Sequence, residues 1–134
     1  MEKPLAAGII LINRAKQVLL ILRDDIPSIP FPNHWDIPGG HLMVGESPEA
    51  CVRREMIEEM ELELGEIQLF KEYDRDDLHE FIYWKQIDLE PSRIKLHEGQ
   101  KAQYFTLEEI NTMRLAFRYN EVIKEFRNLV VKPP

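Results

Sequence analysis

The chain has 134 residues, a formal net charge of −7 at pH 7 and a single cysteine, Cys51. This length suits one domain over residues 1–134. The net negative charge argues against sequence-independent binding of DNA or RNA, which needs a basic surface. A lone cysteine excludes an internal disulfide, the start of the chain lacks the pattern of a secretion signal, and the longest apolar runs fall far short of the ~20 residues that span a bilayer. We therefore expect a cytoplasmic protein that binds neither membranes nor nucleic-acid polymers.

The first third of the chain predicts a hairpin followed by an irregular segment. Residues 6–12 and 18–22 are rich in leucine and β-branched residues and flank a polar stretch, so they predict two strands joined by a turn. Between residues 23 and 38, four prolines remove backbone donors and fix φ, which excludes regular helix or central strand. The glycine pair Gly39-Gly40 then predicts a turn.

The rest of the chain predicts alternating helices and strands. Ser47 followed by Pro48 is typical of a helix N-cap with proline at the first helical position, so a helix is expected from Pro48 to Leu62. Beyond it we expect strands over residues 67–73, 80–87 and 101–105, a short helix from Thr106 and a last helix over residues 119–131. No repeat or linker interrupts this order, which predicts one mixed α/β unit.

Three glutamates on the first expected helix share one face. Glu55, Glu58 and Glu59 stand at positions i, i+3 and i+4, so their carboxylates converge and repel each other. A solvated acidic stripe would show the same spacing, because charged helix faces usually meet water. Spacing alone therefore does not assign a function to these residues.

The surroundings of this triplet resemble a known signature. Residues 40–62 read GHLMVGESPEACVRREMIEEMEL, which is similar to the Nudix family signature GX5EX7REUXEEXGU, where U is an aliphatic residue. Eight of the nine specified positions match, and Glu61 takes the place of the last glycine. At that position either the helix continues, with Gly65 supplying a left-handed cap, or Glu61 is strained. The resemblance implies the Nudix fold, a mixed β-sheet sandwiched between helices in three α/β/α layers.

The resemblance also implies a metal-dependent hydrolase and gives roles to the residues of the signature. A pyrophosphate linkage carries several negative charges, so an acidic site accepts it only when hard cations such as Mg²⁺ or Mn²⁺ lie between them. Such ions lower the pKa of a bound water and neutralise charge on the phosphoryl oxygens. The implied metal ligands are Glu55, Glu58 and Glu59, while Arg54 orients a carboxylate, Gly40 lets the loop approach closely and Glu46 supports the ligands.

Two further residues are candidates for the same site. Several Nudix enzymes carry an additional glutamate in the loop before the strand expected at residues 101–105, and Glu98 fits that place as a metal ligand or general base. An ordinary loop acid is the alternative for Glu98, and which glutamate deprotonates the water stays open. His41 follows the glycine pair and is a candidate phosphate contact.

The substrate is suggested by a narrower resemblance to the compact MutT-type members of the family, which cleave nucleoside triphosphates to the monophosphate and pyrophosphate. Asn120 lies near the place where an asparagine reads the purine in the member that removes 8-oxo-dGTP. Its amide could pair with a base edge, and the aromatic residues available for stacking are Trp35, Phe31 and Tyr73. An N-cap role in the last helix is the alternative for Asn120.

Two other functions stay open at this point. A nucleotide-sugar hydrolase is conceivable because the proline-rich loop before Trp35 could accommodate a bulkier leaving group. A domain that binds a nucleotide without turnover is a known fate of this fold, but the complete REMIEE core argues against it. A small-molecule nucleotide is the expected partner in each case, and a homodimer is left open.

Overall fold

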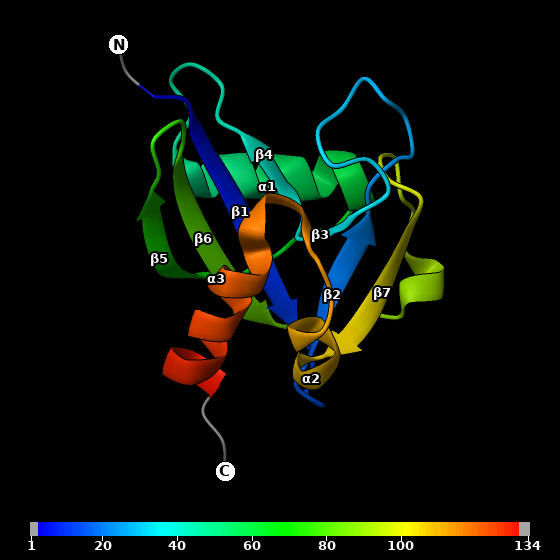
Figure 1. The fold of residues 1–134 in the computed structure, drawn as a ribbon. Helices are drawn as coiled ribbons and strands as arrows, with labels where there is room; N and C mark the ends of the chain where they lie inside the picture. The colour runs from blue at the N-terminus through cyan, green and yellow to red at the C-terminus, as the bar shows by residue number, and fades with distance from the viewer. Residues whose placement is uncertain (1–2, 132–134) are drawn as a thin grey trace.

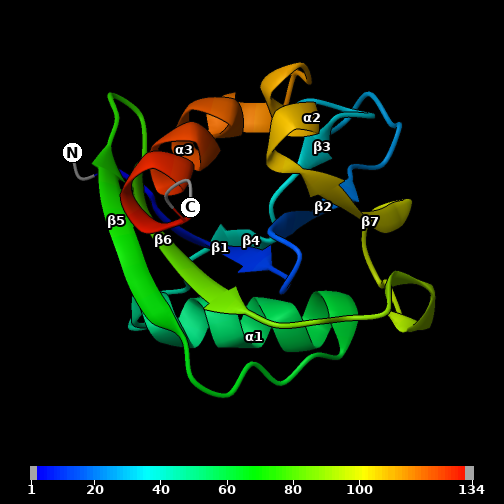
Figure 2. The same ribbon diagram turned by 90° about the horizontal axis from the view of Figure 1, so that it is seen from below.

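The computed structural model describes residues 3–131, which form a seven-stranded mixed sheet with helices on both faces (Figure 1). Seen from below, α1 (Pro48–Met60) covers one face, while α2 (Leu107–Asn111) and α3 (Tyr119–Phe126) cover the other (Figure 2). This arrangement confirms the expected α/β/α layers. Among the described residues, no helix is long and apolar enough to cross a membrane.

The sheet is organised around its first strand. Its members are β1 (Leu5–Ile12), β2 (Gln17–Leu22), β3 (Trp35–Asp36), β4 (Gly39–His41), β5 (Gln68–Asp74), β6 (His79–Gln86) and β7 (Lys101–Thr106). β1 pairs in parallel with β6 along its whole length, while its other edge pairs antiparallel with β4 near its start and with β2 near its end. β2 also pairs with β3 and β7, and β5 completes the far edge beside β6.

The unbroken apolar run of β1 serves two cores. Ile10 and Ile12 are buried in the core beneath α2 and α3, whereas Ile9 and Leu11 are buried in the core beneath α1. Successive side chains of a strand point to opposite faces, so a strand covered on both sides must be apolar at every position. β1 is therefore held rigidly, and the elements paired with it are fixed relative to α1.

α1 begins as its sequence predicts. The Ser47 hydroxyl oxygen accepts a hydrogen bond from the Ala50 backbone N–H at 3.1 Å, and Pro48 occupies the first turn, where a missing N–H costs nothing. The helix buries one apolar face against the sheet, made of Cys51, Val52, Met56 and Met60. Its opposite surface is left to carry charged side chains.

The end of α1 differs from the sequence prediction. The helix stops at Met60, two residues before Leu62, because Glu61 adopts a left-handed conformation with φ 52°. The Glu61 N–H donates to the Ile57 carbonyl oxygen at 3.0 Å and so closes the last turn. Gly65 lies beyond this cap and does not supply it. Of the two alternatives for Glu61, the structure therefore shows the strained one, since a left-handed backbone is unfavourable for a residue with a Cβ.

Two other segments depart from the prediction, and for the first of them the reason is a contact made far along the chain. Gly39-Gly40 was expected to form a turn but lies in β4, where Gly39 pairs with Gly8 of β1. A Cβ at Gly39 would stand 2.3 Å from the Ala7 carbonyl oxygen, so the close approach to β1 requires glycine. The second is the last helix, which changes at Phe126 into a wider turn over Arg127–Val131. The proline-rich segment contains only the short strand β3 at the edge of the sheet, which agrees with the exclusion of helix and central strand.

Candidate functional site

A cavity of about 610 Å³ opens between α1, the segment after β2 and the turn before α3. Its acidic lining consists of Glu55, Glu58, Glu59, Glu98, Asp24 and Asp36. Its apolar lining includes Ile26, Ile29, Pro30 and Phe117. Because carboxylates and apolar groups share one cavity, it suits a molecule that has both a strongly charged part and an apolar or aromatic part.

Three of the expected metal ligands lie against each other in this cavity. Burial, together with the charge and hydrogen bonding of the neighbouring Glu55 and Glu98 carboxyl groups, raises the pKa of Glu59 to about 9. Glu98 belongs to the loop before β7, so the fold brings it to α1 from a distant part of the chain. Carboxyl groups this close cannot all be ionised without a compensating positive charge, which a divalent cation would supply.

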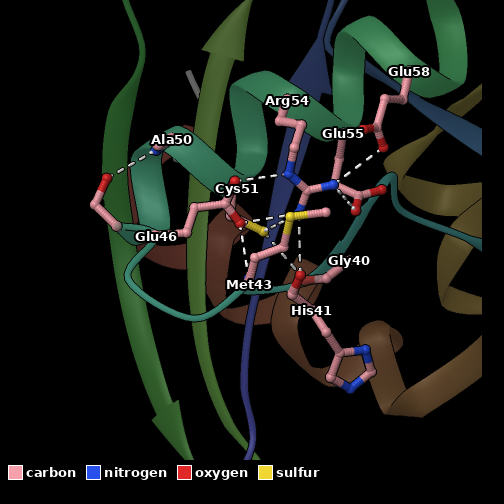
Figure 3. A network of polar contacts seen from close by, with 10 residues as sticks. Gly40, His41, Met43, Glu46, Ala50, Cys51, Arg54, Glu55 and Glu58 are labelled. Carbon is pink, nitrogen blue, oxygen red and sulfur yellow. Dashed lines mark hydrogen bonds and ion pairs between the residues drawn. The ribbon is translucent and has the colours of Figure 1, made fainter.

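The guanidinium group of Arg54 organises the carboxylates of α1 (Figure 3). Its Nη1 donates to a carboxylate oxygen of Glu55 at 2.9 Å and to one of Glu58 at 3.1 Å. Its Nε and Nη2 donate to the two carboxylate oxygens of Glu46 at 2.7 and 2.9 Å. Arg54 therefore orients two of the expected ligands and is itself held by a bidentate ion pair, the strong form of this interaction.

Glu46 supports the loop that leads into α1. The hydrogen bonds from Arg54 and from the Met43 backbone N–H lower the pKa of Glu46 to about 2, so this carboxylate stays ionised at neutral pH. Arg54 also donates to the His41 carbonyl oxygen at 3.2 Å. The pair formed by Glu46 and Arg54 thus ties the loop after β4 to the first turns of α1.

Gly40 is required by the position of Glu55. A Cβ at Gly40 would lie 2.6 Å from the carboxyl group of Glu55, well inside any normal contact distance. The bare backbone leaves that space to the carboxylate, which Arg54 holds from the other side. The group that approaches Gly40 closely is therefore the carboxylate of Glu55.

The remaining residues near the loop have simpler surroundings. His41 lines the cavity, and its imidazole points away from the Arg54 guanidinium (Figure 3). Cys51 is fully buried, its thiol lies 3.6 Å from the Gly40 carbonyl oxygen, and burial raises its pKa to about 11. This thiol is therefore a packing group rather than a nucleophile.

The geometry of the carboxylates on α1 is set by their contacts with Arg54. Within residues 3–131, no group of three or more His, Cys, Asp or Glu side chains stands in a geometry that could hold a metal ion. Arg54 contributes to this, because its Nη1 occupies the space between Glu55 and Glu58. The donor set nevertheless fits a hard cation in its chemistry, and the Glu58 side chain is 54% exposed.

A second polar cluster lies at the cavity wall contributed by β3 and α3. Asp36 and Arg23 pair at 3.0 Å, and burial raises the pKa of Asp36 to about 6 despite this partner. The Tyr119 hydroxyl donates to the buried carboxylate of Glu80 at 2.6 Å, and Arg75 pairs with the same carboxylate at 2.7 Å. The sequence offered no signal for this cluster, since its members come from four separate segments.

The proposed role of Asn120 as a reader of the base is wrong on this geometry. Its amide nitrogen donates to the carbonyl oxygens of Ile110 and Met113 at 3.0 and 2.6 Å, and its amide oxygen accepts from the Leu115 N–H at 2.8 Å. Both donors are committed to the backbone, so none is left for a base edge. The N-cap alternative is also wrong, because Arg118 precedes α3 and Asn120 lies within the helix.

The aromatic residues expected to stack on a base do not line the main cavity. Trp35 packs edge-on against Phe105 and the core, and Tyr73 hydrogen-bonds to Glu125. Phe31 lies behind Phe117, with ring centroids 4.8 Å apart. The aromatic residues that do line the cavity are Phe117 and Tyr119, which sequence reasoning missed.

Comparison with known proteins agrees with the resemblance of the signature. The model of the NUDIX domain family matches residues 2–126. A Bacillus subtilis (strain 168) protein provisionally named an 8-oxo-dGTP diphosphatase is 42% identical over 53 residues, which cover 40% of this chain and 32% of that protein. The match thus spans about a third of the length of this relative.

Solved structures show the same fold at low sequence identity. A MutT protein from Methanosarcina mazei Go1 is 22% identical with a TM-score of 0.77, covering 98% of this chain and 99% of that one. The NUDIX domain of NrtR from Shewanella oneidensis, solved in complex with ADP ribose, is 20% identical with a TM-score of 0.78, covering 96% of this chain and 88% of that one.

Proposed function

This chain belongs to the NUDIX domain family, and from that premise we propose that it hydrolyses a phosphoanhydride bond in a nucleoside diphosphate linked to a second group. The substrate that we favour is a nucleoside triphosphate, with a normal or an oxidised purine, which would give the monophosphate and pyrophosphate. The partial relative from Bacillus subtilis supports this substrate class. The observation that carries the proposal is the grouping of Glu55, Glu59 and Glu98 in one cavity beside Arg54.

The proposal includes Mg²⁺ or Mn²⁺ held by Glu55, Glu58, Glu59 and Glu98. Carboxylate oxygens are the ligands that these cations prefer, and positive charge would relieve the repulsion that raises the pKa of Glu59. When bound, the ions supply a lowered pKa for the attacking water and neutralise charge on the phosphoryl oxygens.

The side chains around the carboxylates have distinct tasks in this proposal. Arg54 and Gly40 confine Glu55 from two sides, so its carboxylate meets the substrate in a fixed position. Glu58 is more exposed and pairs with the same guanidinium nitrogen. In this proposal it gives up that exposed ion pair to bind a cation, which costs little free energy. His41 lines the cavity beside Gly40 and is proposed to contact the phosphates.

The apolar part of the cavity is the proposed place of the nucleobase. Phe117 offers its ring there and is held in position by Phe31 and by the Arg23 guanidinium, which lies 5.1 Å from the ring centroid. An aromatic ring fixed in this way can stack on a base without losing much side-chain freedom. Asn120 has no part in this proposal.

The experiment that tests the function is a substrate panel with product analysis. Nucleoside triphosphates, oxidised purine nucleotides, nucleotide sugars and dinucleotides are incubated with Mg²⁺ or Mn²⁺, and the products are separated by chromatography. Release of pyrophosphate and a monophosphate from triphosphates is expected, with the Glu59→Gln variant as the inactive control. Hydrolysis that proceeds equally in this variant would show that the activity does not belong to this site.

A nucleotide-sugar hydrolase is the second candidate, and one observation favours it. Ile26, Ile29 and Pro30 of the proline-rich segment line the cavity, so this segment can shape the space for a leaving group larger than pyrophosphate. A sugar phosphate among the products would identify this function. Binding of a nucleotide without any product would identify a domain that recognises its ligand without turnover.

A further inference from the structure

Glu61, the residue that departs from the family signature, makes a side-chain contact that glycine cannot make. Its carboxylate accepts a hydrogen bond from His97 Nε2 at 2.6 Å, and this contact lowers the pKa of Glu61. The two residues are 36 positions apart in the chain, so the bond ties the end of α1 to the loop before β7. The left-handed backbone that ends α1 at Glu61 accompanies this contact.

His97 is fixed to the same helix end by a second bond. Its backbone N–H donates to the Glu59 carbonyl oxygen at 2.8 Å, so both the main chain and the ring of His97 rest on α1. The next residue is Glu98, whose carboxyl group lies against that of Glu59 inside the cavity. Any shift of His97 is therefore passed directly to Glu98.

The other side of Glu98 is anchored to the strand β2 and the segment after it. The Gln100 N–H donates to the Leu22 carbonyl oxygen at 2.8 Å, and the Gln100 amide donates to the Arg23 carbonyl oxygen at 2.7 Å. Gly99 has φ 89°, and a Cβ there would lie 2.7 Å from a methyl group of Ile21. The Gly99 N–H also donates to the Asp24 carboxylate at 3.3 Å, and the Gln100 amide to the Asn33 side-chain oxygen at 2.9 Å. Glu98 thus lies between two anchored points, and on the α1 side the only side-chain bond of His97 among the described residues is the one to Glu61.

We propose that Glu61 is a positioning residue, which with His97 forms a latch that holds Glu98 against Glu59. The inference rests on the proposed function, because Glu98 matters only if it belongs to the cation site. The side chains of Glu61 and His97 are both about half exposed, so their bond adds little to the stability of the fold. The latch acts instead by restricting the positions that the loop before β7 can take. Glycine at this position would fit the left-handed backbone but would leave His97 tied to α1 by its backbone bond to Glu59 alone.

The test is Mn²⁺ binding to the purified 134-residue chain, measured by calorimetric titration without substrate. Glu61→Gly and His97→Ala should each weaken Mn²⁺ binding by about two- to tenfold, the range that one hydrogen bond supports. The double variant should be no weaker than either single one, because both changes open the same latch. Glu61→Asn, which also suits a left-handed backbone but is too short to reach His97, should repeat the loss.

Glu61→Gln is the matched control, because it removes the negative charge while keeping an oxygen that accepts from His97. It should bind Mn²⁺ like the original protein. If Glu61→Gln and Glu61→Gly bind equally weakly, the effect is one of charge and the latch proposal is wrong. Wild-type Mn²⁺ affinity in Glu61→Gly would also overturn it.

A third series separates the latch from the proposed site. In a Glu98→Gln background, opening the latch with Glu61→Gly should cost no further affinity, and an additional loss there would overturn the proposal by showing that Glu61 acts elsewhere. If Glu98→Gln alone leaves Mn²⁺ binding unchanged, Glu98 is no cation ligand and both proposals fail at that residue. Hydrogen exchange of the backbone amides at residues 97–99 reports on the latch without any activity and should quicken in Glu61→Gly.

Discussion

Replacing Gly40 by alanine should separate activity from stability. The new Cβ would stand 2.6 Å from the Glu55 carboxyl group, so that group must retreat by about 0.8 Å to reach an ordinary contact of 3.4 Å. The obstructed atoms are the far end of a flexible side chain, so the loss of stability should be smaller than the ~1 to 3 kcal/mol typical of overpacked cores. A ligand displaced by nearly an ångström should reduce kcat/KM by about 100-fold.

Gly65→Ala is the matched control for this prediction. Gly65 has φ 67°, and the nearest group to an added Cβ is the Lys85 ammonium at 3.9 Å, so the substitution is strained but meets no obstacle. It should cost about 1 kcal/mol of stability and leave hydrolysis intact. The assay compares urea unfolding with kcat/KM for both variants. Full activity in Gly40→Ala, or a loss that merely follows its unfolded fraction, would refute the assignment of Glu55 to the reacting site.

Three further predictions concern other parts of the site. Glu59→Gln should reduce turnover by at least 100-fold with the fold retained on circular dichroism, and a chelator should abolish hydrolysis until Mg²⁺ or Mn²⁺ is added back. Asn120→Ala removes three side-chain hydrogen bonds to the backbone, although the Ile110 carbonyl oxygen keeps another donor, the Met113 N–H, and should lower stability by about 2 kcal/mol, with equal kinetic losses for purine and pyrimidine substrates. Because burial raises the pKa of Asp36 to about 6, folding favours its protonated form, so its contribution to stability should fall by roughly 2 kcal/mol as the pH rises from 4 to 7. Urea unfolding at both pH values should show the difference in unfolding free energy between the original protein and Asp36→Asn change by this amount, because the other titrating groups are common to both.

The parts of the fold that were predictable from the sequence carry their signal locally. The start of α1 follows from Ser47 and Pro48, whose cap and fixed φ need no partner from elsewhere. The strands β1 and β2 could be predicted because short apolar runs of that length are typical of buried strands. The signature residues were predictable for a similar reason. Within one helix turn, Glu55 and Glu59 lie on the same face of the helix whatever surrounds them.

The parts that were not predictable depend on partners that lie far along the chain. Gly39-Gly40 is a strand only because β1 lies beside it, and a glycine pair on its own favours a turn. The sequence does not decide where α1 ends, because Glu61 makes its contact with His97 on a distant loop. Glu98 was chosen by resemblance, and its approach to Glu59 depends on the pairing of β7 with β2, which no local pattern reveals.

The segment around Asn120 shows how a residue can shape a cavity without lining it. The three hydrogen bonds of the Asn120 amide hold the turn that runs from Ile110 to Leu115, and the backbone of Leu115 then bridges to Trp35 beside β2. Phe117 follows directly in a left-handed conformation with φ 54°, which is unfavourable for an aromatic residue and persists only where the surrounding structure fixes it. Fixed in this way, its ring reaches the cavity. The asparagine thus influences the proposed base site through the backbone that it holds in place. Its amide donors are used for that backbone and are not free to pair with the base.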